Sequence, residues 1–279
     1  MVARYTALTV LGVIFAFPFY WMFVTSVEPV SRLSDVPPNV LPLWDWGTYN
    51  DAWNAAPWGR YFANSIFIAA AATSLTLGTS LLAGYALASL RFPGKSVVFL
   101  IVLMVLFIPD EVILIPQYLI LDNLRTWVFF GDVGWLNTYQ ALIVPFGASP
   151  FGIFLLRQFF LTLPRDLWDA AQLDGCGRTS YLSRVAAPLA RPALAALAIY
   201  SFLSMWNQFL YPLVIAGLDP NVQPIQVGLA GFLGVHSVEW SRLAAASVFT
   251  TLPVLVIFLL AQRQIIEGVA AGGIGGIEK

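Results

Sequence analysis

Residues 61–90, YFANSIFIAAAATSLTLGTSLLAGYALASL, contain no charged side chain. A helix needs about 20 consecutive apolar residues to cross the hydrocarbon core of a bilayer, so this stretch predicts a transmembrane helix. Four more uncharged stretches of this kind occur elsewhere in the chain, at residues 5–27, 133–156, 192–218 and 243–262. A sixth apolar stretch begins at Ser96, is interrupted after Pro109 by Asp110 and Glu111, and resumes at Val112.

These stretches predict an all-α integral membrane protein with six transmembrane helices. We expect one transmembrane domain over residues 1–279, with spans at about 5–27, 62–88, 96–116, 136–156, 192–215 and 243–262. The first stretch also has features of a signal peptide. Its apolar part exceeds the usual length of roughly 7–15 residues, however, and no small-x-small cleavage site follows it promptly, which favours an uncleaved helix.

The composition indicates that lipid is the main solvent of this chain. Hydrophobic residues make up 59% of the 279 residues and charged residues only 10%, whereas a soluble domain has about 25% charged residues. The net charge of −1 implies no basic surface for nucleic acid. One histidine and one cysteine exclude a His-rich metal cluster and make nucleophile–base pairs scarce, so we expect no catalysis by this chain.

The distribution of lysine and arginine predicts how the chain is oriented. Cytoplasmic segments of membrane proteins carry an excess of these residues. With the N-terminus inside, ten of the 14 lysine and arginine residues lie on the cytoplasmic side. Both termini and the loop 157–191 are therefore expected to be cytoplasmic. The Pro- and Trp-rich loop 28–60 is expected outside, at the membrane interface.

The cytoplasmic loop contains a segment with helix signals at both ends. Pro164 suits the first turn of a helix, and Asp166 complements the positive end of its dipole. Gly175 stands where a helix end requires a positive φ. A second short helix is expected after it, capped by Thr179 or Ser180 and running to about residue 186. This pattern predicts a helix–Gly–helix elbow, and the alternative is an amphipathic helix lying on the membrane surface.

A longer pattern runs through this elbow. It reads Asp169-Ala170-Ala171, three residues, Gly175, nine residues and Val185-Ala-Ala-Pro188. It resembles the cytoplasmic loop motif of ATP-binding-cassette (ABC) importer permeases, Glu-Ala-Ala, three residues, Gly, nine residues, Ile-x-Leu-Pro. The chain departs from that motif with Asp at 169, Val at 185 and Ala at 187.

Other stretches are similar to the shorter membrane subunit of maltose-type carbohydrate importers of bacteria: GYALASLRFPG at 84–94, SPFGIFLLRQFF at 149–160, WNQFLYP at 206–212 and EGVAAGGIGG at 267–276. The resemblance implies a type I importer permease fold in the bacterial inner membrane. It also implies a second permease subunit forming a heterodimer, two cytoplasmic ATPase subunits and an extracellular solute-binding protein. ATP and Mg would bind to the ATPase, and no cofactor to this chain.

The resemblance also implies which residues contact the ATPase, namely those of the elbow: Asp169, Ala170, Ala171, Asp174 and Gly175. ATP hydrolysis itself is expected elsewhere. Gly94-Lys95-Ser96 looks like the end of a phosphate-binding loop, but such a loop requires glycine at position 89, where this chain has Ser89.

Polar residues inside the predicted spans are candidates for a solute path, because polar groups are costly in lipid. The fifth span carries Ser201, Ser204, Trp206, Asn207 and Gln208, with Ser204 and Asn207 expected on one helical face. An indole ring beside amide groups suits a sugar, and the alternative is hydrogen bonding to a partner permease. Glu111 is a further candidate for which the alternative is a plain helix end. Gln117, Asn64 and Ser65 are weaker candidates.

Two other function classes are open from the residues alone. An ion-coupled secondary transporter usually has inverted repeats and buried ionisable residues, and neither is evident here. An intramembrane enzyme requires metal ligands or a nucleophile with a base, for which the chain has few residues. The cargo of an importer is left open by the sequence, among monosaccharides, disaccharides and glycerophosphate compounds.

Overall fold

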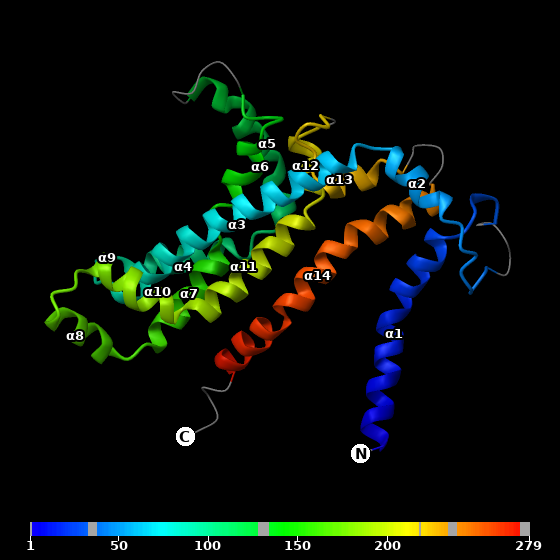
Figure 1. Ribbon diagram of the computed structural model, residues 1–279. Coiled ribbons are helices and arrows are strands. Elements are labelled where there is room, and N and C mark those ends of the chain that lie inside the picture. The colour runs from blue at the N-terminus through cyan, green and yellow to red at the C-terminus, as the bar shows by residue number, and fades with distance from the viewer. Residues whose placement is uncertain (1, 33–37, 128–133, 218, 234–238, 274–279) are drawn as a thin grey trace. The chain divides into compact units, whose positions relative to one another are not determined.

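The computed structural model describes residues 2–32, 38–127, 134–217, 219–233 and 239–273, which are mainly helical (Figure 1). The chain forms two compact units, which we call unit 1 (Met1–Phe62 with Pro224–Leu259) and unit 2 (Ala63–Gln223 with Leu260–Lys279). The predicted single transmembrane domain stays a prediction. The helices are α1 (Val2–Ser26), α2 (Gly47–Asn54), α3 (Trp58–Ser89), α4 (Lys95–Val105), α5 (Asp110–Trp127), α6 (Tyr139–Ile143), α7 (Pro150–Thr162), α8 (Arg165–Leu173), α9 (Arg178–Tyr181), α10 (Ala187–Leu189), α11 (Arg191–Trp206), α12 (Leu210–Ile215), α13 (Ile225–Ala230) and α14 (Trp240–Gly273), with short 3₁₀ segments at Val30–Arg32 and Val144–Phe146 and a π-helix at Leu182–Ala186.

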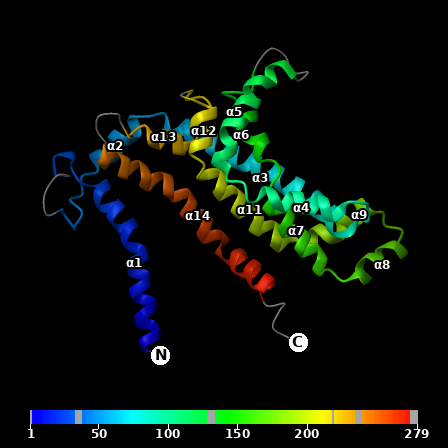
Figure 2. The same ribbon diagram turned by 180° about the vertical axis from the view of Figure 1, so that it is seen from behind.

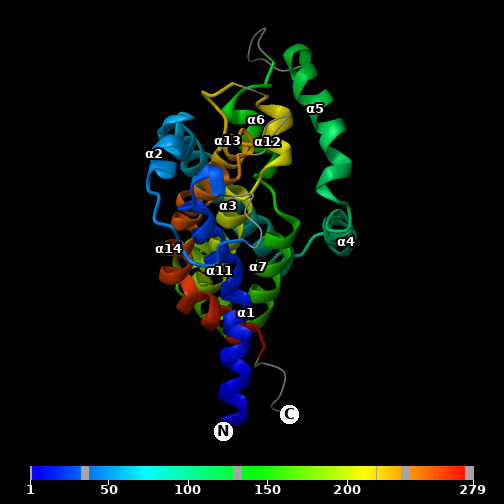
Figure 3. The same cartoon turned by 90° about the vertical axis from the view of Figure 1, so that its right-hand side faces the viewer.

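The described helices include four that are long and apolar enough to cross a membrane and two bent pairs that bring the total to six. The four are Arg4–Ser26, Trp58–Ser89, Tyr139–Thr162 and Trp240–Leu259. The first bent pair is α4 with α5, whose axes differ by 100°, and Figure 3 shows this turn. The interruption near Pro109 that the sequence indicates is therefore a sharp change of direction.

The fifth predicted span differs most from the structure. Helix α11 ends at Trp206, and α12 begins at Leu210, so the predicted span 192–215 is two helices. At its other end, α11 meets the helical segment Arg178–Leu189 at an angle of 76°. Pro192 near the start of α11 cannot donate a backbone hydrogen bond, which favours a new helix at that point.

Unit 2 is held together by close contact between α3 and α7. A β-carbon added at Gly84 would lie 3.0 Å from Leu156 Cβ, and one added at Gly152 would overlap Ser80 Oγ. Small residues let two helix backbones approach each other in a membrane protein. Where α3 ends, Lys95 Nζ donates hydrogen bonds to the carbonyl oxygens of Ala88 and Leu90, at 2.9 and 3.0 Å.

Unit 1 has a core of aromatic rings. The side chain of Trp58 is 1% exposed, and its Nε1 donates a hydrogen bond to the carbonyl of Ala52 at 2.8 Å. Its ring stacks on Phe232 and meets Phe249 edge to face, with centroids 6.0 and 4.9 Å apart. Part of the predicted outer loop 28–60, helix α2, is thereby anchored to this core.

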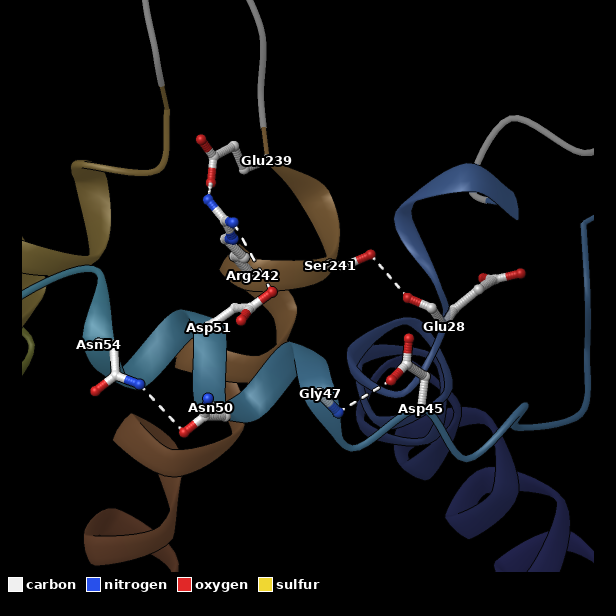
Figure 4. A network of polar contacts seen from close by, with 9 residues as sticks. All are labelled: Glu28, Asp45, Gly47, Asn50, Asp51, Asn54, Glu239, Ser241 and Arg242. Carbon is white, nitrogen blue, oxygen red and sulfur yellow. Dashed lines mark hydrogen bonds and ion pairs between the residues drawn. The ribbon is translucent and has the colours of Figure 1, made fainter.

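A polar network surrounds the start of α14 in the same unit (Figure 4). Arg242 lies between Glu239 and Asp51, with nitrogen–oxygen distances of 2.8 and 3.9 Å. Ser241 Oγ donates a hydrogen bond to the carbonyl of Glu28 at 2.9 Å. These contacts fix α2 and the segment that follows α1 against the start of α14.

Candidate functional site: an elbow and a cavity

The predicted elbow is present in unit 2. Helix α8 ends with Asp174 as its C-cap, and Gly175 has a φ of +75°. The amide of Cys176 donates to the carbonyl of Ala171 at 2.8 Å, and that of Gly175 donates to Gln172 at 3.0 Å. This pair of bonds is the Schellman motif, which requires the left-handed residue that glycine supplies here. The positive φ predicted for Gly175 is confirmed.

The second half of the elbow is built differently from the prediction. Helix α9 begins at Arg178 with Gly177 as its N-cap, so neither Thr179 nor Ser180 caps it, and no side chain does. The Arg178 guanidinium lies 5.4 Å from the centre of the Trp168 ring, which holds the first residue of α9 against α8.

A π-helix at Leu182–Ala186 follows α9. In it, the amide of Ala187 donates to the carbonyl of Leu182, five residues earlier. Pro188, next in sequence, has no N–H to continue the ordinary ladder. The sequence pattern predicted a plain short helix here, and the proline accounts for the wider turn.

The inner face of the elbow is fixed to the helices of unit 2. The Trp168 ring meets Tyr181 edge to face at 5.1 Å, and Tyr181 lies 6.3 Å from Tyr85 of α3. Tyr85 in turn meets Phe160 of α7 at 5.8 Å. Ala171 is 7% exposed and belongs to the same cluster. This cluster therefore joins α8 to α3 and α7 by direct side-chain contact.

The outer face of α8 is open. Leu173 is 90% exposed, although a leucine gains about 1.5–3 kcal/mol from burial. Of the predicted coupling residues, Asp169, Ala170, Asp174 and Gly175 are exposed, and Ala171 is buried within the chain. The arrangement is a rigid bend with an exposed apolar residue between acidic ones.

Unit 2 also contains a cavity of about 640 Å³. It lies where three helical segments are interrupted, between α4 and α5, before α7, and between α11 and α12. In a bilayer, irregular backbone is tolerated where it lines a water-filled cavity. Figures 1 and 2 place α5, α6 and α12 at one end of unit 2 and the elbow at the other. The lining residues are Thr76, Ile101, Val102, Val105, Asp110, Glu111, Ile113, Leu114, Gln117, Pro145, Phe146, Ala148, Ser149, Pro150, Ile153, Tyr200, Ser201, Ser204, Met205, Gln208, Leu210 and Tyr211.

The cavity brings together three of the five residues predicted for a solute path: Ser204, Gln208 and Glu111. Trp206 is not among its lining residues: it is 1% exposed and stacks on Phe202 with centroids 6.1 Å apart. Asn207 does not line it either. Its Nδ2 donates to the carbonyl of Leu203 at 2.9 Å.

Ser204 and Asn207 are expected on one helical face, but only Ser204 lines the cavity. Helix α11 ends at Trp206, and Asn207 is its C-cap. Side-chain directions therefore stop following helical spacing at that residue.

The cavity has aromatic walls that the sequence pattern did not single out. Tyr200 is 54% exposed and lies one helical turn before Ser204. Phe146 meets Tyr211 edge to face at 4.9 Å, and the Tyr211 hydroxyl donates to the carbonyl of Ala141 at 2.9 Å. The spacing of Tyr200, Ser204 and Gln208 by four residues was the available signal. Phe146 and Tyr211 reach the cavity only through the tertiary fold.

Asn64, one of the weaker candidates for the solute path, is buried and makes hydrogen bonds within the protein. Its side chain is 2% exposed, its Nδ2 donates to the carbonyl of Gln223 at 2.8 Å, and its Oδ1 accepts from the Tyr139 hydroxyl at 2.7 Å. Among the described residues, no group of three His, Cys, Asp or Glu side chains is placed to hold a metal ion.

Comparison with known proteins shows that the chain is similar to transport permeases. Residues 80–269 match the family described as binding-protein-dependent transport system inner membrane component. The chain is 32% identical to the arabinooligosaccharides transport system permease protein AraQ of Bacillus subtilis, over 95% of this chain and 92% of that protein. It is also 32% identical to the trehalose/maltose transport system permease protein MalG of Thermococcus litoralis, covering 95% and 94%. It is 31% identical to the sn-glycerol-3-phosphate transport system permease protein UgpE of Yersinia pestis, covering 90% and 89%.

The fold has solved counterparts. A chain in the crystal structure of a bacterial ABC transporter involved in the import of the acidic polysaccharide alginate superposes with a TM-score of 0.80 at 21% identity, over 94% of this chain and 95% of that one. The same kind of transporter, in complex with an alginate pentasaccharide-bound periplasmic protein, superposes with a TM-score of 0.68 at 15% identity, over 92% of both chains. The predicted type I importer permease fold is confirmed.

These matches support the importer permease and not the ion-coupled alternative. Permeases of this family generally bind no cofactor of their own. The chain therefore belongs to the binding-protein-dependent transport family as a multi-pass membrane permease, the non-catalytic subunit of a sugar-type ABC importer.

Proposed function

We propose that this chain forms half of the translocation path for a sugar or sugar-like solute in the inner membrane of a bacterium, with both termini in the cytoplasm. A second permease supplies the other half. Two cytoplasmic ATPase subunits bind ATP and Mg and drive the cycle, and an extracellular solute-binding protein delivers the cargo. Helix α8 contacts one ATPase, and the cavity of unit 2 lies on the solute path.

One observation carries this proposal: the inner face of α8 is packed against unit 2, and its outer face is exposed. Its inner face is joined through Trp168 and Tyr181 to α3 and α7, while Leu173 stands 90% exposed on its outer face. A helix that transmits the movement of an ATPase must be packed against the transmembrane helices on one face. Its other face must be exposed so that the ATPase can bind. The elbow has both.

The cavity supports the same function. Interrupted helices that meet around a cavity are a recurrent feature of transporter sites, because unwound backbone offers polar groups where a continuous helix has none. The walls combine the rings of Tyr200, Phe146 and Tyr211 with the hydroxyl or amide groups of Ser204 and Gln208. A sugar presents apolar C–H faces and a rim of hydroxyl groups, and this lining can bind both.

Substitution of Leu173 by Glu tests the contact with the ATPase. Burial of the leucine in an interface contributes about 1.5–3 kcal/mol, so its loss weakens docking about ten- to hundredfold. We expect the variant to insert normally but to lose the ATPase during purification in detergent. Hydrolysis stimulated by the binding protein is lost with it.

The matched control is Ser183→Glu, which adds the same charge at an exposed position in the second half of the elbow. This variant retains the ATPase. Retention of the ATPase by Leu173→Glu, or transport by this chain in liposomes without any other polypeptide, contradicts the proposed function.

A further inference from the structure

The charged groups that line the cavity of unit 2 are all acidic. Asp110 and Glu111, in the first turn of α5, both line it. None of the lining residues that the structure describes is a lysine, arginine or histidine. Both carboxylates are exposed, and the ion pairs found among the described residues all involve Arg242. No ion pair with a basic side chain in the described part of the chain therefore neutralises these two carboxylates.

A second observation in the same wall independently indicates a ligand: a nearly buried serine whose hydroxyl group has no partner among the residues that the structure describes. Ser201 lines the cavity, is 8% exposed, and makes no hydrogen bond to another residue in the described ranges. Its hydroxyl group is therefore available to a molecule in the cavity. The polar side chains of Gln117, Ser204 and Gln208, also in the lining, make no hydrogen bond within those ranges either. This wall offers several unpaired donors and acceptors to an occupant.

From this lining we infer that the cavity favours neutral or amino-substituted saccharides and disfavours saccharides that carry phosphate or carboxylate groups. The inference rests on the proposed function, in which the cavity lies on the solute path. Carboxylates accept strong hydrogen bonds from sugar hydroxyls and attract ammonium groups. Because both carboxylates are exposed and partly screened, they repel an anion by a factor of about three and attract a cation by about the same factor.

The fold alone leaves this preference open. Relatives and structural neighbours of the chain include proteins named for sn-glycerol 3-phosphate and for an acidic polysaccharide. The shared fold therefore does not set the charge preference, to which the side chains lining the cavity contribute. In this chain those side chains include Asp110 and Glu111.

The charge of the cavity can be measured without knowledge of the cargo. The chain has one cysteine, so Cys176→Ser provides a cysteine-free background, and Ser204→Cys places a thiol in the cavity. In the assembled importer, the rate of thiol modification is compared for two methanethiosulfonates, one bearing a trimethylammonium group and one bearing a sulfonate. Ser183→Cys, at an exposed site on the elbow, is the control.

We expect the ratio of cationic to anionic rates to be about tenfold higher at Ser204→Cys than at Ser183→Cys. Replacing both acids, as Asp110→Asn with Glu111→Gln, lowers the ratio at position 204 towards the control and leaves position 183 unchanged. A ratio at 204 that equals the control, or that does not respond to removal of the acids, overturns the inference. Gln208→Cys serves as a second reporter if Ser204→Cys does not assemble.

A transport measurement separates this inference from the proposed function. The complete importer in proteoliposomes is offered a mixture of neutral, amino-, phospho- and carboxy-saccharides, and the contents are identified by mass. Import of neutral or amino saccharides supports the inference. Preferential import of the acidic saccharides overturns it and leaves the proposed function standing. Import of no saccharide contradicts the proposed function itself.

Discussion

Gly175 provides the sharpest test of the elbow. A side chain can be added there without a clash, so a substitution tests the backbone conformation alone. Its φ is +75°, and a β-carbon added there would meet no atom within 4 Å. Gly175→Ala therefore introduces no clash and changes only the backbone energy. For an L-residue the left-handed region costs about 1–2 kcal/mol. That cost corresponds to a factor of about 5–30 in the population of the native bend.

Two further substitutions at position 175 should have a smaller and a larger effect than alanine. Asn tolerates the left-handed region better than Ala, so Gly175→Asn is milder. Proline fixes φ near −65° and removes the N–H that donates to Gln172, so Gly175→Pro excludes the bend. We expect solute uptake per ATP hydrolysed to fall in the order Gly, Asn, Ala, Pro. Membrane insertion stays unchanged because the spans are not affected.

The assay is uptake and ATPase activity in proteoliposomes that contain the full importer. Gly177→Ala is the matched control, since Gly177 has a φ of −74° and its added β-carbon also meets nothing within 4 Å. Normal coupling in Gly175→Pro refutes the reasoning. Equal damage from Gly177→Ala and Gly175→Ala also refutes it, because the positive φ would then not be the cause.

Two pairs of substitutions test the packing of the units by thermal unfolding in detergent. Gly152→Ala forces a β-carbon against Ser80 and should cost about 1–3 kcal/mol, whereas Gly78→Ala, with nothing within 4 Å, should be neutral or stabilise by up to about 1 kcal/mol. A larger loss for Gly78→Ala would show that the contact of α3 with α7 is misplaced. In unit 1, Trp58→Ala should cost about 3–5 kcal/mol. Asp51→Asn should cost less than about 1 kcal/mol, because its ion pair at 3.9 Å is exposed. Comparable losses from these two variants would contradict an aromatic core around Trp58.

The elbow was predictable in outline because its signals are local. Gly175 follows a helical stretch at the position where only a left-handed residue closes the turn, and its partners lie within four residues of it. The wrong detail was the cap of the second helix. Thr179 and Ser180 have the right chemistry, but the packing of Arg178 on Trp168 selects an earlier start, and that contact joins two different helices.

The solute path was predictable only in part. Tyr200 and Ser204 lie one turn apart on α11, and Gln208, four residues further on and past the end of the helix, also lines the cavity. Trp206, predicted from its indole ring, and Asn207, predicted from its spacing to Ser204, do not line the cavity. The Trp206 indole lies in the core, where it stacks on Phe202. The Asn207 amide, at the end of α11, donates to the carbonyl of Leu203 in that helix.

The sequence by itself determined that the chain crosses a membrane, about where its helices lie, and that one loop carries a motif resembling that of ABC importer permeases. These properties depend on the apolarity of about 20 consecutive residues and on spacings within one turn or bend, so no distant contact is needed. Only the tertiary structure decided which polar side chains share a cavity. That choice depends on where α4, α7 and α11 are interrupted and on the glycine contacts that bring their neighbours together, and both are set by residues far apart in the chain.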